Sequence, residues 1–184
     1  MMYGCCGLAQ EQRGSRLVGH VRTLLLAAPF LAAISGASSA RELVSYDAAV
    51  QPGTIVVKTS ERRLYLVLAN GSALRYPIAV GRPGRQWFGQ VAIEGKYLKP
   101  AWSPPALVKR DNPRLPDVIP GGAPNNPMGA AALMLSGGEY AIHGTNRPSS
   151  IGNFASYGCI RMHNSDIVDL FDRVDVGAPV MVKL

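Results

Sequence analysis

The sequence predicts a mainly β domain with one short helix near its C-terminal end, and three observations support this class. Short runs rich in β-branched and aromatic residues alternate with turn-forming residues along most of the chain. Residues 164–177 instead place apolar side chains on one face of a helix. Residues 81–127 are rich in Gly and Pro, which predicts a long irregular stretch within the domain.

The first forty residues have the composition of a secretory signal peptide. Three arginines come first, an uncharged run follows and small residues end the segment: Arg13, Arg16 and Arg22, then residues 23–34, then residues 35–40. The uncharged run is shorter than the roughly twenty residues that cross a bilayer as a helix. A buried N-terminal helix is the alternative, against which Pro29 argues. We therefore expect residues 1–40 to be a signal peptide and the protein to be exported to the periplasm or cell wall.

Removal of this segment changes the cysteine content of the mature chain. Cys5 and Cys6 lie within it, so Cys159 alone remains. An exported chain with a single cysteine forms no internal disulfide, and its thiol either pairs with another chain or is kept for its reactivity. A small buried side chain is the plain alternative, because free cysteine is often buried. The Gly and Arg residues near Cys159 favour a reactive thiol.

Residues 41–184 have the size of one domain, with a short linker over 41–52 and the domain itself over 53–184. The predicted signal peptide contains three arginines and one acidic residue, Glu11. Of the 19 basic and 12 acidic residues of the full sequence, 16 and 11 therefore remain, which gives a formal net charge of +5. This excess favours acidic partners such as a wall polymer. No basic cluster is interleaved with aromatic residues, which argues against a nucleic-acid partner. We expect a monomer.

The predicted strands begin with an antiparallel meander. Three runs form it, with a hairpin turn at Asn70-Gly71 before the third: residues 54–58, 63–68 and 74–80. Pro77 lacks the N–H that a sheet ladder needs, so it predicts an edge strand or a bulge. Four more strands are expected, at residues 90–93, 131–135, 140–143 and 179–183.

The single helix is predicted to begin at Asn164 or Ser165, either of which suits an N-cap, and to end at Gly177. Asp166 in the first turn matches the positive end of the helix dipole. The apolar face comprises Ile167, Leu170, Phe171 and Val174.

Four aromatic residues accompany the irregular stretch 81–127, namely Trp87, Phe88, Tyr97 and Trp102. Long irregular stretches in compact domains often line a site or cover it. The aromatic side chains either form walls of a substrate groove or pack beneath the stretch and hold it down, and the sequence supports both equally.

Residues 143–162 read HGTNRPSSIGNFASYGCIRM and place His143 and Cys159 sixteen positions apart. A thiol reacts as a thiolate, so it needs a nearby base or positive charge, which His143 and Arg161 can supply. Gly158 permits a sharp turn that directs backbone N–H groups toward an oxyanion. Alternatively, His143 is a buried histidine whose hydrogen bonds serve only the core. Arg161 could likewise form a surface ion pair with Asp166 or Asp169.

This segment resembles the signature of the L,D-transpeptidases, the YkuD-like catalytic domains, in which a His-Gly pair precedes a Ser-x-Gly-Cys-[Ile/Leu]-Arg run. The resemblance covers roughly residues 53–184 and is strongest over 141–169. It implies a β-sandwich-like L,D-transpeptidase catalytic domain with the short helix after the nucleophile loop.

The resemblance also implies residue roles. Cys159 would be the nucleophile and His143 the base, with the Gly144 backbone carbonyl orienting the imidazole. The backbone N–H groups of Tyr157, Gly158 and Cys159 would bind the oxyanion. Two further side chains complete the set, Ser156 as a support of the loop and Arg161 as a ligand for a substrate carboxylate or the thiolate.

By the same resemblance, the substrate would be the tetrapeptide stem of peptidoglycan, which loses its terminal D-alanine as it forms a thioester with Cys159. The acceptor amine would belong to a second stem, giving a 3-3 cross-link, or to an outer-membrane protein. Water as acceptor would make the protein an L,D-carboxypeptidase. Carbapenems would acylate Cys159, and no cofactor or metal is implied.

Three rival functions remain at the level of the sequence. A secreted cysteine peptidase usually places its cysteine before its histidine, and the order here is reversed. A non-catalytic wall-binding module would not need His143, Cys159 and Arg161 together. A zinc site from His143, Cys159 and His163 lacks a fourth ligand and any C-x-x-C pair.

Overall fold

The computed structural model describes residues 41–47, 49–138 and 140–184, so the predicted signal peptide lies outside the described residues. Ten strands and two α-helices form the described part, which confirms the mainly β prediction. The strands are β1 Glu42–Ser45, β2 Ile55–Lys58, β3 Arg63–Val67, β4 Ser72–Gly81, β5 Gly89–Leu98, β6 Ala131–Leu135, β7 Ala141–His143, β8 Phe154–Ser156, β9 Ile160–Met162 and β10 Pro179–Lys183. The helices are α1 Ala106–Asp111 and α2 Asn164–Arg173, and Pro148–Ser150 forms a 3₁₀ turn. Within these residues, neither helix has the length and apolar character that a membrane crossing requires.

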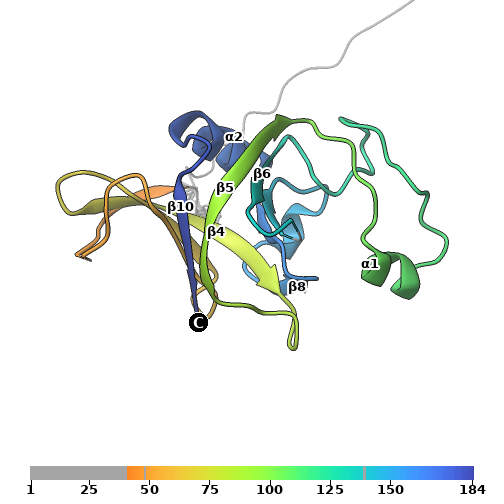
Figure 1. Ribbon diagram of the computed structural model, residues 1–184, viewed down its shortest axis with the longest axis horizontal. Helices are drawn as coiled ribbons and strands as arrows, with labels where there is room; N and C mark the ends of the chain where they lie inside the picture. The colour runs from red at the N-terminus through yellow and green to blue at the C-terminus, as the bar shows by residue number, and fades with distance from the viewer. Residues whose placement is uncertain (1–40, 48, 139) are drawn as a thin grey trace, which may run out of the picture. The chain divides into compact units, whose positions relative to one another are not determined.

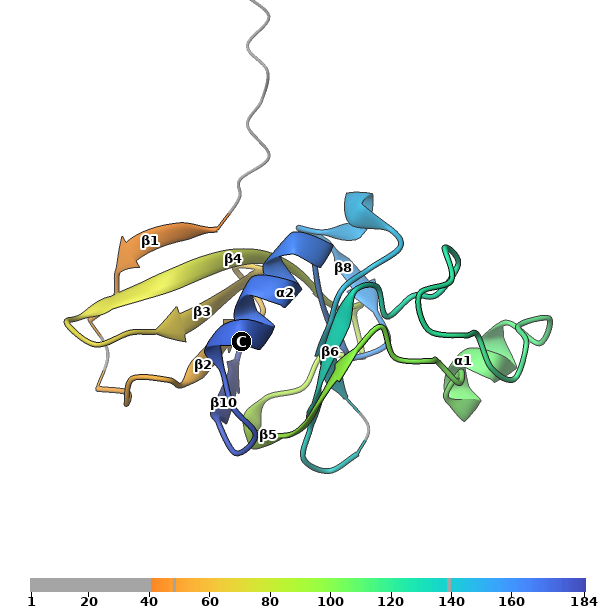
Figure 2. The ribbon, with the colours of Figure 1, turned by 90° about the horizontal axis from the view of Figure 1, so that it is seen from above.

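The strands pair in the order β1-β4-β3-β2-β10-β5-β6-β7-β9, and β9 also pairs with β4, so eight of them follow one another in a closed circuit. The meander β2-β3-β4 is antiparallel, as predicted, whereas β10 joins β2 in parallel. Between β5 and β6 the chain leaves the sheet in a long connection that contains α1 (Figures 1 and 2).

Pro77 lies neither on an edge strand nor at a bulge. It is the last residue of β4 to pair with β3, opposite Arg63, and the next residue, Ile78, pairs with Met162 of β9. Pro77, which has no N–H, therefore lies where β4 changes its partner strand from β3 to β9. The N–H of Ile78 still donates to the carbonyl oxygen of Arg62, just before β3, at 3.1 Å. This change of partner connects the meander to the strands that carry the sequence motif.

Residues 42–45, which the sequence places in a linker, form β1 and pair with the first half of β4. The helix α1 was not predicted either, and the strands β8 and β9 lie where the sequence indicates only the nucleophile loop. These four elements have three to six residues each, too few for a periodic apolar pattern to appear.

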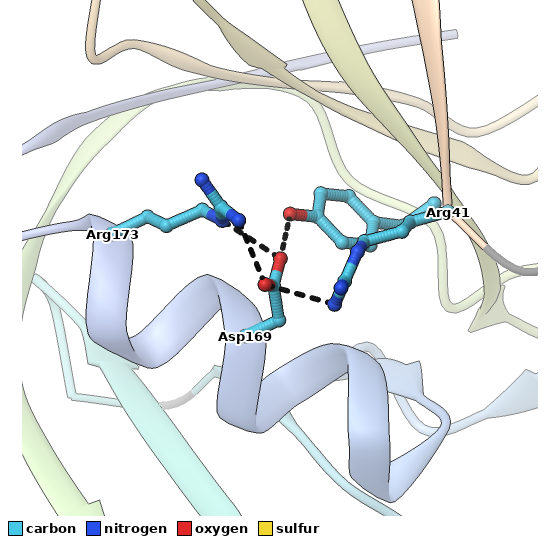
Figure 3. Close-up of polar contacts among 4 residues, drawn as sticks. Arg41, Asp169 and Arg173 are labelled. Atoms are coloured by element: carbon cyan, nitrogen blue, oxygen red, sulfur yellow. Dashed lines mark hydrogen bonds and ion pairs between the residues drawn. The ribbon is translucent and has the colours of Figure 1, made fainter.

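Helix α2 ends at Arg173 and not at the predicted Gly177, so Val174 of the predicted apolar face lies beyond it in an extended conformation. The helix packs against β6 and β7, and Ile167 and Leu170 on its apolar face are fully buried. On its other side Asp169 anchors it to the sheet (Figure 3). The carboxylate accepts hydrogen bonds from Tyr76 of β4 at 2.7 Å and from Arg173 at 2.9 Å, and it pairs with Arg41 at 2.8 Å. The helix is thus fixed on both sides, and the motif that leads into it is fixed with it.

Candidate active site

The parallel pair β7–β9 brings the two halves of the sequence motif together. His143 in β7 lies directly opposite Arg161 in β9. Side chains two residues apart on a strand project to the same side, so Cys159, just before β9, faces the side that Arg161 and His143 face. All three side chains line one cavity of about 720 Å³. The chain therefore folds a thiol, an imidazole and a guanidinium into the lining of one cavity.

His143 is almost completely buried, with 4% of its surface exposed. Its Nδ1 lies 2.7 Å from the carbonyl oxygen of Gly144, the contact that the resemblance implies. Because a carbonyl only accepts, Nδ1 carries the proton, and Nε2 of the neutral ring is left as an acceptor. Burial and, next, the charge of Arg161 lower the pKa of His143 to about 4, although the carbonyls of Gly144 and Pro127 oppose the shift. At neutral pH the imidazole is an uncharged base.

Cys159 is a free, half-buried thiol beside an apolar cluster that includes Met128 and Ala132. Burial raises the pKa of the Cys159 thiol, and this effect exceeds the opposing effects of a hydrogen bond with the Ala141 backbone and of the Arg161 charge. The sequence suggests a thiolate made anionic by its neighbours. The structure instead favours a neutral thiol that lines the same cavity as a neutral imidazole.

Ser156 holds the backbone of the nucleophile loop. Its hydroxyl donates to Cys159 O at 2.5 Å and accepts from the N–H of Gly158 at 3.1 Å. Of the three N–H groups predicted to bind an oxyanion, the one on Gly158 is therefore already occupied. The N–H groups of Tyr157 and Cys159 remain as candidates. Ser156 itself is buried and supports the loop, as the resemblance implies.

Trp87 and Tyr140 also hold this loop. The sequence left two predictions open for Trp87, a wall of the groove or packing beneath the irregular stretch. The indole Nε1–H of Trp87 donates to Gly158 O at 2.9 Å, and its ring stacks on Tyr140 with centroids 5.0 Å apart. Gly158 has φ +132°, and a Cβ atom there would lie 2.3 Å from the Tyr140 ring. Only glycine fits this position, so the peptide next to Cys159 is fixed from two sides.

Asn164 holds the other half of the site, a role that the sequence does not reveal. It begins α2, yet His163 is the N-cap residue and no side chain caps the helix. The Asn164 Oδ1 accepts from the N–H groups of Ala130 and Thr145, each at 3.0 Å, and its Nδ2 donates to Thr145 O at 3.1 Å. A Cβ atom on Gly144 would lie 2.2 Å from this Oδ1. The amide thus packs against the peptide whose carbonyl orients His143.

Arg161 forms neither of the surface ion pairs that the sequence left open. Asp169 pairs with Arg41 and Arg173, and no hydrogen bond or ion pair joins Arg161 to Asp166 in the described chain. Burial lowers the pKa of Arg161, which nevertheless remains charged. A half-buried guanidinium without a carboxylate partner is suited to bind an anionic group of a ligand.

The opposite wall of the cavity belongs to the connection between β5 and β6. Trp102 and Ile119 form an isolated bridge at its base, and residues 103–118 between them, which we call the lid, contain α1. Trp102 lines the cavity, whereas Phe88 and Tyr97 are 71% and 54% exposed and do not. Of the four aromatic residues, Trp102 thus forms part of the cavity wall and Trp87 supports the loop that carries Cys159. Phe88 and Tyr97 lie outside the cavity.

Asp111 at the end of α1 joins the lid to the motif. Its Oδ2 accepts from Arg82 Nη2 and from the Tyr157 hydroxyl, each at 3.0 Å, and the Arg82 guanidinium lies 4.0 Å from the centroid of the Tyr157 ring.

The zinc site that the sequence leaves open as an alternative would use His143, Cys159 and His163 as ligands. In the described residues, no three His, Cys, Asp or Glu side chains converge in a way that could hold a metal ion.

Comparison with known proteins agrees with this geometry. The family model of the L,D-transpeptidase catalytic domain (YkuD) matches residues 52–182. A Salmonella typhimurium protein described as a probable L,D-transpeptidase, ErfK/SrfK, is 42% identical over 137 residues, which are 70% of this chain and 43% of that protein. The chain thus spans less than half the length of this relative.

Two solved structures have related folds. The L,D-transpeptidase from Mycobacterium smegmatis superposes with a TM-score of 0.57 at 17% identity, over 71% of this chain and 58% of that one. A Brucella melitensis protein described as a probable carnitine operon oxidoreductase is 39% identical, with a TM-score of 0.52 over 74% and 89% of the two chains. That description concerns another activity, but the family model covers most of the chain studied here. The resemblance of the motif is therefore confirmed, and the chain belongs to the L,D-transpeptidase catalytic domain family.

Proposed function

We propose that the protein is an exported peptidoglycan L,D-transpeptidase that forms a thioester between Cys159 and the tetrapeptide stem. The observation that carries this proposal is the shared cavity, in which a free thiol, a neutral buried imidazole and an unpaired guanidinium face the same space. Membership of the family supports the reaction class, and the substrate follows from the chemistry of that class.

The first half-reaction cleaves the bond before the terminal D-alanine. The Cys159 sulfur attacks the carbonyl carbon of the diamino acid while its proton moves to Nε2 of His143. The C–N bond then breaks, the leaving D-alanine amine takes that proton, and the thioester remains. Because both groups are neutral at rest, no ion pair has to be desolvated before the attack. Gly144 keeps the imidazole in the required tautomer throughout.

The N–H groups of Tyr157 and Cys159 would bind the developing oxyanion. The N–H of Gly158 already donates to Ser156 Oγ, whereas no side chain of the described residues accepts a hydrogen bond from the other two. Arg161 would bind a carboxylate of the stem peptide close to the sulfur. In this arrangement the loop fixed by Ser156 and Trp87 supplies electrostatic stabilisation, and Arg161 supplies orientation.

In the second half-reaction an acceptor amine attacks the thioester carbonyl, its proton passes to His143, and Cys159 leaves and is protonated again. An amine of a second stem would give a 3-3 cross-link, and one on an outer-membrane protein would give a tether. Water would give an L,D-carboxypeptidase. The cavity of about 720 Å³ is open to an extended peptide and does not itself select among these acceptors.

Mass spectrometry of purified tetrapeptide muropeptides after incubation with the protein tests the proposal. We expect loss of D-alanine and a tripeptide joined to an acceptor, and a transient protein adduct at Cys159. The incubation is repeated with an outer-membrane protein as acceptor and with a carbapenem as an acylating agent. Absence of every Cys159 adduct, with folded protein, would overturn the proposed function.

A further inference from the structure

The cavity carries an unbalanced positive charge beyond that of Arg161. Its lining includes three arginines, Arg85, Arg147 and Arg161, and no Asp or Glu. His143 is neutral and adds no charge at pH 7. Asp111, the carboxylate that joins the lid to the motif, does not line the cavity and is already engaged by Arg82 and Tyr157. Arg85 and Arg161 are half-buried and Arg147 is exposed, so an anionic ligand that enters the cavity would meet three cations with no carboxylate among the lining residues.

None of the three guanidinium groups has a hydrogen-bond or ion-pair partner among the described residues. Ion pairs of that part of the chain involve other cations, such as Arg82 with Asp111 and Arg173 with Asp169. Burial and, to a smaller extent, the charge of Arg147 lower the pKa of Arg161, so these two lining cations lie within electrostatic reach of each other. A bound anion would lower the repulsion between like charges in the cavity.

Both additional arginines come from turns that the backbone holds in place. The N–H of Arg147 donates to Thr145 Oγ1 at 3.0 Å, directly after the peptide that Asn164 fixes. The N–H of Arg85 donates to Arg82 O at 2.8 Å, and a Cβ atom on Gly81 would lie 2.1 Å from Arg85 O. The chain positions of these two side chains are therefore defined before a ligand arrives.

We propose that Arg85 and Arg147 form a second carboxylate site, so that the cavity selects a peptide with at least two free carboxylates. This inference rests on the proposed function and narrows its substrate. One carboxylate meets Arg161, two residues from Cys159, and the other meets Arg85 and Arg147, which line the same cavity. A stem peptide in which one side carboxylate is converted to an amide keeps its shape but loses the charge that this second site binds.

Binding and turnover together test the proposal. In the Cys159→Ala background, calorimetry measures the Kd of the free-acid tetrapeptide and of its amidated counterpart. We expect the free acid to bind about tenfold more tightly, the effect of one charge-assisted contact. Arg85→Gln and Arg147→Gln should each reduce this preference. Arg114→Gln is the matched control, because Arg114 is an exposed arginine of the lid that does not line the cavity.

Equal Kd values for the two peptides, or a preference that persists in both glutamine variants, would overturn the second carboxylate site. A loss of affinity that is the same for both peptides would also overturn it, because it would indicate a structural effect of the substitution. Turnover by the unsubstituted protein is measured separately on the same peptides. Failure of turnover with a preserved binding preference would reject the proposed reaction and leave the second site in place.

Discussion

The two walls of the cavity differ in how they are held. The motif wall, residues 141–164, is tied by contacts of buried or half-buried groups, in which Ser156, Trp87 and Asn164 fix individual peptides. In the lid, residues 103–118, α1 buries no residue. The contacts of the lid are with exposed groups: Asp111 pairs with Arg82 and accepts a hydrogen bond from Tyr157 of the motif wall, and Lys109 pairs with Asp117 within the lid.

This difference separates chemistry from access. In the proposed reaction, proton transfer and oxyanion binding need accurately placed atoms, and the residues proposed for these steps lie on the wall whose peptides are fixed. A peptide substrate has to enter and leave, so the wall that covers it is held by exposed pairs that contribute little to stability. Substitutions in the motif wall should therefore change the chemical step, and substitutions in the lid should change access.

Substitution of Cys159 by Ala tests the motif wall at its centre and should have the largest effect. Without the sulfur no thioester forms, so transfer should fall below detection. The side chain is half-buried, so the fold should persist. Product analysis by mass spectrometry and a circular dichroism melt measure the two effects. Transfer by a folded Cys159→Ala protein would refute the covalent mechanism.

Substitution of His143 by Gln removes the base but leaves Cys159 in place. General-base assistance contributes about 10²- to 10⁴-fold, so alkylation of the thiol by iodoacetamide near neutral pH should slow by about 10²-fold or more. Because the pKa of the Cys159 thiol is raised, the variant should recover part of the rate at high pH, where hydroxide removes the proton. An unchanged rate at pH 7 would assign the base to another group.

The same residue makes stability depend on pH. The pKa of His143 is about 4 in the folded protein against 6.5 for the free side chain. Between these values the unfolded chain binds more protons, so the contribution to stability is complete above pH 6.5 and is lost as pH falls toward 4. The loss should be on the order of 3 kcal/mol at about 1.4 kcal/mol per pKa unit. Urea unfolding at pH 7 and pH 4 should show this loss, and His143→Gln should reduce it.

Trp87 supports the motif wall without facing the cavity, so its substitution should have a smaller effect. Trp87→Phe keeps an aromatic ring against Tyr140 but removes the donor to Gly158 O. An unpaired carbonyl costs about 1 to 3 kcal/mol, and the freed peptide should lower kcat more than it raises KM. Trp102→Phe is the matched comparison, since Trp102 lines the cavity and should change KM instead. If Trp87→Phe has the same kcat and KM as the unsubstituted protein, the hydrogen bond from Trp87 to Gly158 O does not support the site.

The sequence predicts much of the fold because its apolar and β-branched runs are local signals, and the strands at 131–135 and 179–183 have the expected limits. It also identifies the residues of the motif, whose spacing is itself the signal. It does not identify Asn164 as the support of Gly144, because the same residue type before a helix is typical of an N-cap. Trp87 is equally obscure, since its partner Gly158 lies 71 positions away and no local pattern joins them.

The lid should respond least, and its response distinguishes the two walls most directly. Asp111→Asn keeps an oxygen that can accept from Tyr157 but removes the charge that pairs with Arg82. Because exposed pairs contribute little, cleavage of the lid by trypsin at Arg110 or Arg114 should accelerate only severalfold, while thermal unfolding of the domain and alkylation of Cys159 stay unchanged. Asp117→Asn is the control, since Asp117 pairs with Lys109 inside the lid and does not reach the motif wall. Slower alkylation of Cys159 in Asp111→Asn would show that the lid also positions the nucleophile, and the separation of chemistry from access would then be wrong.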